Sequence, residues 1–224
     1  MKRFFSPDNF AMKALTLFCD WMFMTWIYII FSLPIITIGA STTAMYSLIF
    51  KKLNKLEAPM VKTFAHEFKA NFKKATLFWI PYLLIEVFLV ADVYIAHNLI
   101  GENLKFFQYP AAILAFLIFS GTIFVFPQIA KFESPMKTII KNSLLLSISN
   151  IPTVILIIVT LLVPALLATL SPKATFIVLS CMIFFGFGFL FYIYSLYINR
   201  IFNKILKVGE FSENPEEESE EIED

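Results

Sequence analysis

Residues 151–170 read IPTVILIIVTLLVPALLATL, an apolar segment without one charged side chain. At about 1.5 Å per residue, a helix of this length covers the roughly 30 Å hydrocarbon layer of a bilayer. The whole chain of 224 residues is 58% hydrophobic, contains 27 Phe and is only 16% charged. Ordinary soluble domains are roughly half apolar and about a quarter charged. The sequence therefore predicts an all-α fold, a polytopic transmembrane helix bundle.

Five apolar segments are long enough to cross a membrane. The predicted spans are residues 15–38, 77–99, 107–129, 151–170 and 174–198. The first is longer than the apolar region of a signal peptide, about 7 to 15 residues, so we assign it to the mature protein. All five belong to a single predicted domain, residues 1–209, and the acidic residues 210–224 form a tail that we expect to be disordered and cytoplasmic.

The basic residues are distributed so as to orient the predicted bundle. Nine of the 17 acidic residues lie between Glu210 and Asp224, which leaves eight acidic against 18 basic residues in the rest of the chain. Basic residues near spans are retained in the cytoplasm, and most of them lie in residues 40–76, in residues 131–147 and after the last span. A cytoplasmic C-terminus and five passes place the N-terminus outside. Nucleic-acid binding is the weaker interpretation, because the lysines flank apolar spans.

The N-terminal lead leaves a second topology open. It carries Lys2, Arg3 and Lys13, and these charges oppose an external N-terminus. In the alternative, the N-terminus is inside and Leu15 to Phe50 forms a hairpin of two short, tilted or re-entrant segments.

An amphipathic helix is predicted after the first span. Met60, Phe64, Phe68 and Phe72 recur every four residues, while lysines occupy the opposite side. Such a helix lies in the interface plane, with its aromatic side in the acyl region and its lysines toward anionic headgroups. The predicted lipid or partner contacts are Lys62, Lys69, Lys73 and Lys74. The alternative is a helix that docks on the bundle as a structural collar.

Four ionisable residues fall inside predicted spans, namely Asp20, Glu86, Asp92 and His97. A charge inside hydrocarbon costs at least about 2.5 to 3.5 kcal/mol, so such residues are functional candidates. One interpretation is an ion or substrate relay along the second span. The other is that a protonated Glu86 and a hydrogen-bonded Asp92 hold helices together. Snorkelling or a structural contact explains Asp20, near the outer end of the first span.

Catalytic and metal-binding patterns are absent from the sequence. The two cysteines lie in apolar segments, and the two histidines have no ligand spacing. No phosphate loop, nucleophile elbow or paired-carboxylate motif lies on a predicted aqueous loop. We therefore expect a protein without enzymatic activity, cofactor or metal, and a lipid-acting enzyme has no positive support.

The segment around the end of the first span resembles a known family signature. Cys19-Asp20 is followed by SLPIITIGASTTAMY at residues 32–46, by FKANFKKAT at residues 68–76 and by KNSL at residues 141–144. This pattern is similar to the YesL-like family of bacterial membrane proteins, and the similarity extends over most of the chain. The resemblance implies a bacterial inner-membrane protein with a domain of unknown function. It also implies an accessory role beside a carbohydrate transporter subunit.

The quoted signature predicts a break between two helices. Pro34 weakens the end of the first helix, Gly39 permits a left-handed terminus, and Ser41 or Thr42 can cap the next helix. The expected elbow, at the cytoplasmic interface, consists of Pro34, Thr37, Gly39, Ser41, Thr42 and Tyr46. Its hydroxyl groups suggest a docking or small-solute site, and a purely architectural corner is the alternative.

Two functional hypotheses follow. The leading one is a non-enzymatic accessory protein that binds a membrane partner, such as a carbohydrate transporter, through the amphipathic helix and the elbow. The rival is a small transporter or channel that uses Glu86, Asp92 and His97. Small residues in the spans permit self-association without requiring it, so the oligomeric state stays open.

Overall fold

The computed structural model describes residues 10–54, 56, 59–98, 106 and 108–213. Every regular element in these ranges is helical, which confirms the all-α prediction. The elements are α1 (Phe10–Ser32), the 3₁₀ turn η1 (Ile35–Thr37), α2 (Ile38–Leu53), α3 (Met60–Asn98), α4 (Gln108–Lys131), α5 (Met136–Ser149), α6 (Ile151–Leu170), α7 (Pro172–Cys181), the π-helical turn η3 (Met182–Gly186) and α8 (Phe187–Glu213).

Five helical segments of the described chain are long and apolar enough to cross a membrane, so the chain is a multi-pass membrane protein. They are Met12–Ser32, Met60–Ile95, Gln108–Lys131, Ile151–Leu170 and Pro172–Leu206.

Two of the predicted boundaries need correction. The first helix ends at Ser32, before the predicted residue 38, because Pro34 interrupts the helical hydrogen bonds and η1 follows it. The last candidate span, Pro172–Leu206, is longer than predicted, and helix α8 continues beyond it to Glu213, inside the segment assigned to the tail. The remaining tail, residues 214–224, lies outside the described residues, as do positions 99 and 107 of the second and third predicted spans.

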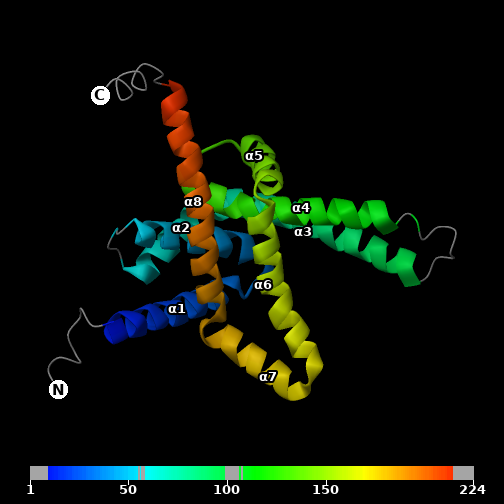
Figure 1. The fold of residues 1–224 in the computed structure, drawn as a ribbon, viewed down its shortest axis with the longest axis horizontal. Coiled ribbons are helices and arrows are strands. Elements are labelled where there is room, and N and C mark those ends of the chain that lie inside the picture. The colour runs from blue at the N-terminus through cyan, green and yellow to red at the C-terminus, as the bar shows by residue number, and fades with distance from the viewer. Residues whose placement is uncertain (1–9, 55, 57–58, 99–105, 107, 214–224) are drawn as a thin grey trace.

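Two helical hairpins extend from a common centre (Figure 1). Helices α3 and α4 form one hairpin, whose tip lies at the right of the view, and α6 and α7 form the other, whose tip lies at the bottom. Helix α8 crosses α1, α2 and α4, and its C-terminal half points to the top. The first residues of α1 lie at the left, away from both hairpin tips.

The centre of the protein is α2, which is buried from Gly39 to Phe50 apart from Thr42. One apolar cluster joins α2 to α4 and α8 through residues that include Tyr46, Phe124 and Phe202. A second joins α2 to α1 and to the first part of α3, around Met24, Met45, Ile49 and Phe64. A helix of only 16 residues therefore organises the packing of the longer ones.

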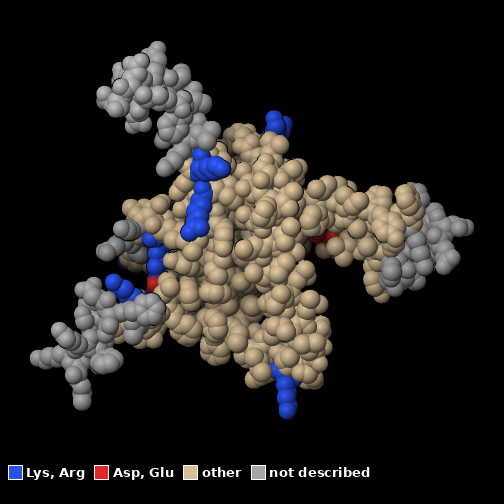
Figure 2. All heavy atoms as spheres, viewed as in Figure 1, with Lys and Arg blue, Asp and Glu red and all other residues tan. Residues whose placement is uncertain are grey.

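The two hairpins expose large apolar side chains along most of their length. Phe88 of α3 is 71% exposed and Phe176 of α7 is 74% exposed. Figure 2 shows these arms almost free of charged atoms, whereas Lys and Arg gather at the left and the top of the same view. Exposed apolar surface of this extent is stable only in contact with lipid or with another protein.

Candidate functional site

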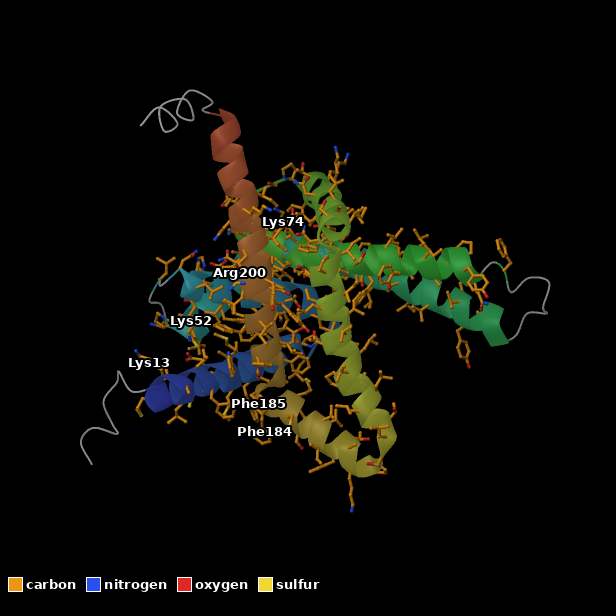
Figure 3. The ribbon with its side chains drawn as sticks, viewed as in Figure 1. Lys13, Lys52, Lys74, Phe184, Phe185 and Arg200 are labelled. Carbon is orange, nitrogen blue, oxygen red and sulfur yellow. The ribbon has the colours of Figure 1, made fainter. Side chains whose placement is uncertain are left out.

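Ion pairs join α1 and α3 to the end of α2. Lys52 at the end of α2 forms an ion pair with Asp20 of α1, and Lys51 Nζ lies 2.7 Å from Glu67 Oε1 of α3. Figure 3 shows Lys13 and Lys52 on the same side of the molecule. Asp20 was predicted to lie near the outer end of the first span. In the structure it pairs with Lys52, which belongs to the basic segment at residues 40–76.

The same end of the molecule gathers the other basic segments. Lys74 Nζ of α3 donates a hydrogen bond of 2.7 Å to the Ser134 carbonyl, just before α5. Lys131 Nζ of α4 donates to Asn199 Oδ1 and Asn203 Oδ1 of α8, both at 2.8 Å. We call this region, formed by Lys51, Lys52, Lys74 and Lys131 with their partners, the basic end.

Glu67 joins α3 to α2 at the basic end. It lies in the first part of α3, before the apolar stretch that begins at Leu77. Its Oε1 atom accepts the hydrogen bond of 2.7 Å from Lys51 Nζ, and its side chain is only 13% exposed. The pair therefore holds the first part of α3 against the end of α2.

The predicted elbow exists, but Thr37 stabilises it in place of Ser41 or Thr42. Thr37 Oγ1 approaches the carbonyl oxygens of Phe31 and Pro34, each at 2.7 Å. Helix α2 begins at Ile38 without a side-chain cap, so the predicted capping roles of Ser41 and Thr42 are wrong. Both residues lie inside the helix because its first turn starts earlier than the pattern suggested.

Gly39 serves close packing and does not adopt the predicted left-handed conformation. It lies in the first turn of α2, and a Cβ at this position would be 2.6 Å from Trp79 Cβ of α3. Trp79 Nε1 also donates a hydrogen bond of 2.8 Å to the Ile35 carbonyl. The glycine therefore lets α2 approach α3, and Trp79 ties the elbow to α3 at a point remote from Lys52.

The hydroxyl groups of the elbow do not form a docking surface. Ser41 is fully buried and Tyr46 is 5% exposed, and burial raises the pKa of the Tyr46 hydroxyl. Thr42 Oγ1 lies 3.3 Å from the hydroxyl oxygen of Tyr28. The outward surface of the elbow is apolar, with Leu33 exposed. The geometry matches an architectural corner.

The predicted amphipathic helix is the first part of α3 and continues without interruption into the second span. Phe64 is fully buried, and its ring centroid lies 5.1 Å from that of Phe31. Met60, Phe64 and Phe68 pack in the cluster with α1, so the collar alternative describes this part of the helix, whereas Phe72 is 39% exposed. Lys62, Lys69 and Lys73 are exposed, and their contact with lipid or a partner stays a prediction.

The remaining intramembrane candidates lie on the α3–α4 hairpin. Glu86 is half-buried, and its Oε2 atom is enclosed without a hydrogen-bond partner in the described structure. Asp92 is exposed farther along the same helix. His97 lies within α3, but its side chain is outside the described residues, so the relay remains untested. Among the residues with described positions, no three His, Cys, Asp or Glu side chains could hold a metal ion.

Comparison with known proteins finds a similarity to a family of unassigned activity over part of the chain. The family described as "Protein of unknown function, DUF624" matches residues 20–93, which run from Asp20 in α1 through the elbow and α2 into α3. A relative, "Uncharacterized protein YteU" of Bacillus subtilis (strain 168), is 27% identical over 143 residues, which cover 59% of this chain. The match spans 63% of that relative, less than two thirds of its length. No solved structure matches the chain.

The matched segment contains three of the four lysines that form the basic end, Lys51, Lys52 and Lys74. It also contains Asp20, Glu67 and, at the elbow, Trp79. The contacts of Lys131 with Asn199 and Asn203 lie outside the matched segment, and they were not predicted from the sequence. The signal that could have revealed them is the spacing of four residues between Asn199 and Asn203, which places both amides on one face of a helix.

Proposed function

We propose that this chain is a YesL-like, non-enzymatic accessory protein that binds another membrane protein through the α3–α4 hairpin. The observation that carries the proposal is the position of two carboxyl groups, Glu86 and Asp92, on an otherwise apolar exposed arm. Neither carboxyl forms an ion pair with another residue that the structure describes.

The energetics favour a partner over lipid at these positions. A carboxylate facing hydrocarbon costs at least about 2.5 kcal/mol, and a hydrogen-bond donor or cation on a partner helix would offset this cost. The neighbouring Val87 and Val90, 60% and 57% exposed, offer apolar contact area on the same helix. A membrane subunit of a carbohydrate uptake system is the partner that the YesL-like resemblance supports.

Removing both carboxyl groups should separate partner binding from stability. In Glu86→Leu/Asp92→Leu, we expect recovery of the transporter subunit from mild-detergent membranes to fall at least about tenfold, because charged hydrogen bonds contribute about 1.5 to 3 kcal/mol each. The thermal stability of the isolated protein should not fall, because two polar groups leave an apolar surface. Quantitative mass spectrometry of the captured material measures the first effect, and Phe176→Leu/Ile177→Leu on the exposed surface of α7 is the control.

A photocrosslinker can test whether the partner contacts this arm. Placed at Val90, it should form a crosslink to the transporter subunit, whereas the equally exposed Ile177 on α7 should not. Equal crosslinking from both positions, or recovery of this protein alone, would contradict the proposal.

The basic end supports an internal N-terminus. Positive residues face the cytoplasm, so the basic end and the C-terminal part of α8 are assigned to that side. The ion pair of Asp20, in the middle of α1, with Lys52 supports the same side for that part of α1. Helices α1 and α2 then form the hairpin of the second sequence topology, entering and leaving on one side, while α3, α4, α6 and the α7–α8 segment cross.

Cysteine labelling distinguishes the two topologies. In a Cys19→Ser/Cys181→Ala background, a membrane-impermeant maleimide should label Lys173→Cys in intact cells. It should label Lys13→Cys and Lys204→Cys only after permeabilisation, since both lie on the proposed cytoplasmic side. Labelling of Lys13→Cys in intact cells would contradict this topology and support an external N-terminus.

A small transporter is the second candidate, and the enclosed, unpartnered Oε2 of Glu86 favours it. Purified protein in proteoliposomes would then catalyse uptake that Glu86→Gln abolishes, because glutamine keeps the shape and removes the proton. Ordinary flux in Glu86→Gln would exclude this role.

A further inference from the structure

A groove lies between α3, α4 and α5 at the side of the basic end. Its volume is about 390 Å³, within the roughly 300 to 1,000 Å³ of typical ligand sites. The wall is mostly apolar and includes Phe78 and Ile85 of α3, Ile118 and Val125 of α4, and Ile140 and Leu144 of α5.

The groove is built by a close α4–α5 contact. A Cβ at Gly121 would lie 2.8 Å from Leu144 Cδ2, and Gln128 Nε2 donates a buried hydrogen bond of 2.7 Å to Ser143 Oγ. The Thr122 hydroxyl on the wall donates to the Ile118 carbonyl at 3.0 Å. The hydroxyl groups of Thr122 and Ser143 both have hydrogen-bond partners within the protein. The interior of the groove therefore suits a hydrocarbon chain better than a polar group.

The rim of the groove is positively charged. Lys74 lies one turn before the lining residue Phe78 and is joined to the Ser134 carbonyl. Lys137 and Lys141 are exposed on α5, each next in sequence to a lining residue, Met136 or Ile140. Figure 2 shows basic atoms at the top of the molecule, where α5 lies. The exposed Glu133 is the acidic residue of the linker before α5, so the rim keeps a positive balance.

We propose that this groove binds one anionic phospholipid, with an acyl chain between α3, α4 and α5 and the headgroup phosphate on Lys137 and Lys141. Charge complementarity selects the occupant, because an apolar slot below a lysine rim matches the two parts of an anionic lipid. Lys74 donates a hydrogen bond to Ser134 in the linker between α4 and α5, and it adds positive charge at the rim of the groove. The site is separate from the exposed face of α3 that carries Asp92.

Native mass spectrometry of the delipidated full chain tests the site. With equal amounts of phosphatidylglycerol and phosphatidylcholine added, the protein should retain one phosphatidylglycerol. Lys137→Ser/Lys141→Ser should weaken its retention about thirtyfold, since each lysine near a lipid headgroup contributes about 1 kcal/mol and 1.4 kcal/mol corresponds to tenfold. The matched control, Lys173→Ser/Lys204→Ser, removes two exposed lysines of α7 and α8, helices that do not line the groove, and should retain the lipid.

A second variant tests the groove itself. Ile140→Trp enlarges a side chain that is 37% exposed at the groove, so it should exclude the acyl chain and leave the lysines in place. Loss of phosphatidylglycerol in this variant, with unchanged thermal stability before lipid is added, supports the proposal. Equal retention of both lipids, equal loss in the two lysine variants, or full binding in Ile140→Trp would each overturn it.

Discussion

Replacing Gly188 by alanine is expected to destabilise the protein by about 3 kcal/mol. A Cβ at this position would lie 2.2 Å from the Trp21 carbonyl oxygen and 3.0 Å from Thr25 Oγ1. The Gly188 amide also donates a hydrogen bond of 2.9 Å to Thr25 Oγ1. The obstacle is helix backbone, which cannot rotate away, so α8 must move off α1 and the cost reaches the upper end of overpacking effects, about 1 to 3 kcal/mol.

Thermal unfolding in detergent measures this effect. A loss of about 3 kcal/mol corresponds to a decrease in Tm of roughly 6 to 12 °C for a chain of this size. Gly186→Ala is the matched control, because its Cβ would meet the flexible end of Met182 at 2.7 Å, which can move aside. Equal decreases in the two variants would show that the α1–α8 contact is looser than the structure indicates.

Lys131→Met should have the second largest effect, a loss of about 2 to 3 kcal/mol. The ammonium group donates to two asparagine side chains of α8 and lies 5.8 Å from the Phe50 ring centroid and 5.5 Å from that of Phe202. Hydrogen bonds from a charged group contribute about 1.5 to 3 kcal/mol, and a cation over an aromatic ring adds about 0.5 to 1 kcal/mol. Methionine keeps the length of the side chain and removes both interactions.

The same unfolding assay can separate this contact from a general charge effect. Lys204→Met removes an exposed lysine of α8 and should change stability by less than about 0.5 kcal/mol. Combining Lys131→Met with Asn199→Ala and Asn203→Ala should cost less than the sum of the separate losses, because the three residues share one interaction. Additive losses would contradict the proposed contact.

These contacts explain how the protein presents an uncovered arm. The basic end and the α1–α8 crossing hold the centre together, while the α3–α4 and α6–α7 hairpins diverge from it (Figure 1). The divergence leaves much of α3 beyond Tyr82 exposed, including Val87, Phe88 and Val90. The partner proposal and the lipid site therefore use different surfaces of one helix.

The sequence by itself determined the helical class and the membrane setting. Uninterrupted apolar runs are visible in the local sequence. Because their lengths match the thickness of a bilayer, they indicate helices surrounded by lipid. It also located the elbow from the pattern of Pro34 and Gly39, although a proline alone does not end a helix in this protein, since Pro81, Pro127 and Pro164 lie inside α3, α4 and α6. The predicted span at residues 151–170 coincides with α6, because the polar residues Asn150 and Ser171 bound the apolar run on both sides.

Only the tertiary structure decided what the polar residues and the glycines do. Gly39 has the residue type of a helix terminus, yet its role comes from Trp79, which lies 40 positions later in the chain. Asp20 has the pattern of a lone intramembrane charge, and its partner Lys52 is known only once α1 and α2 are packed. Such pairings depend on how helices meet, and hydrophobic periodicity carries no information about which faces meet. For that reason the spans could be predicted from the sequence, whereas the basic end and the groove between α3, α4 and α5 could not.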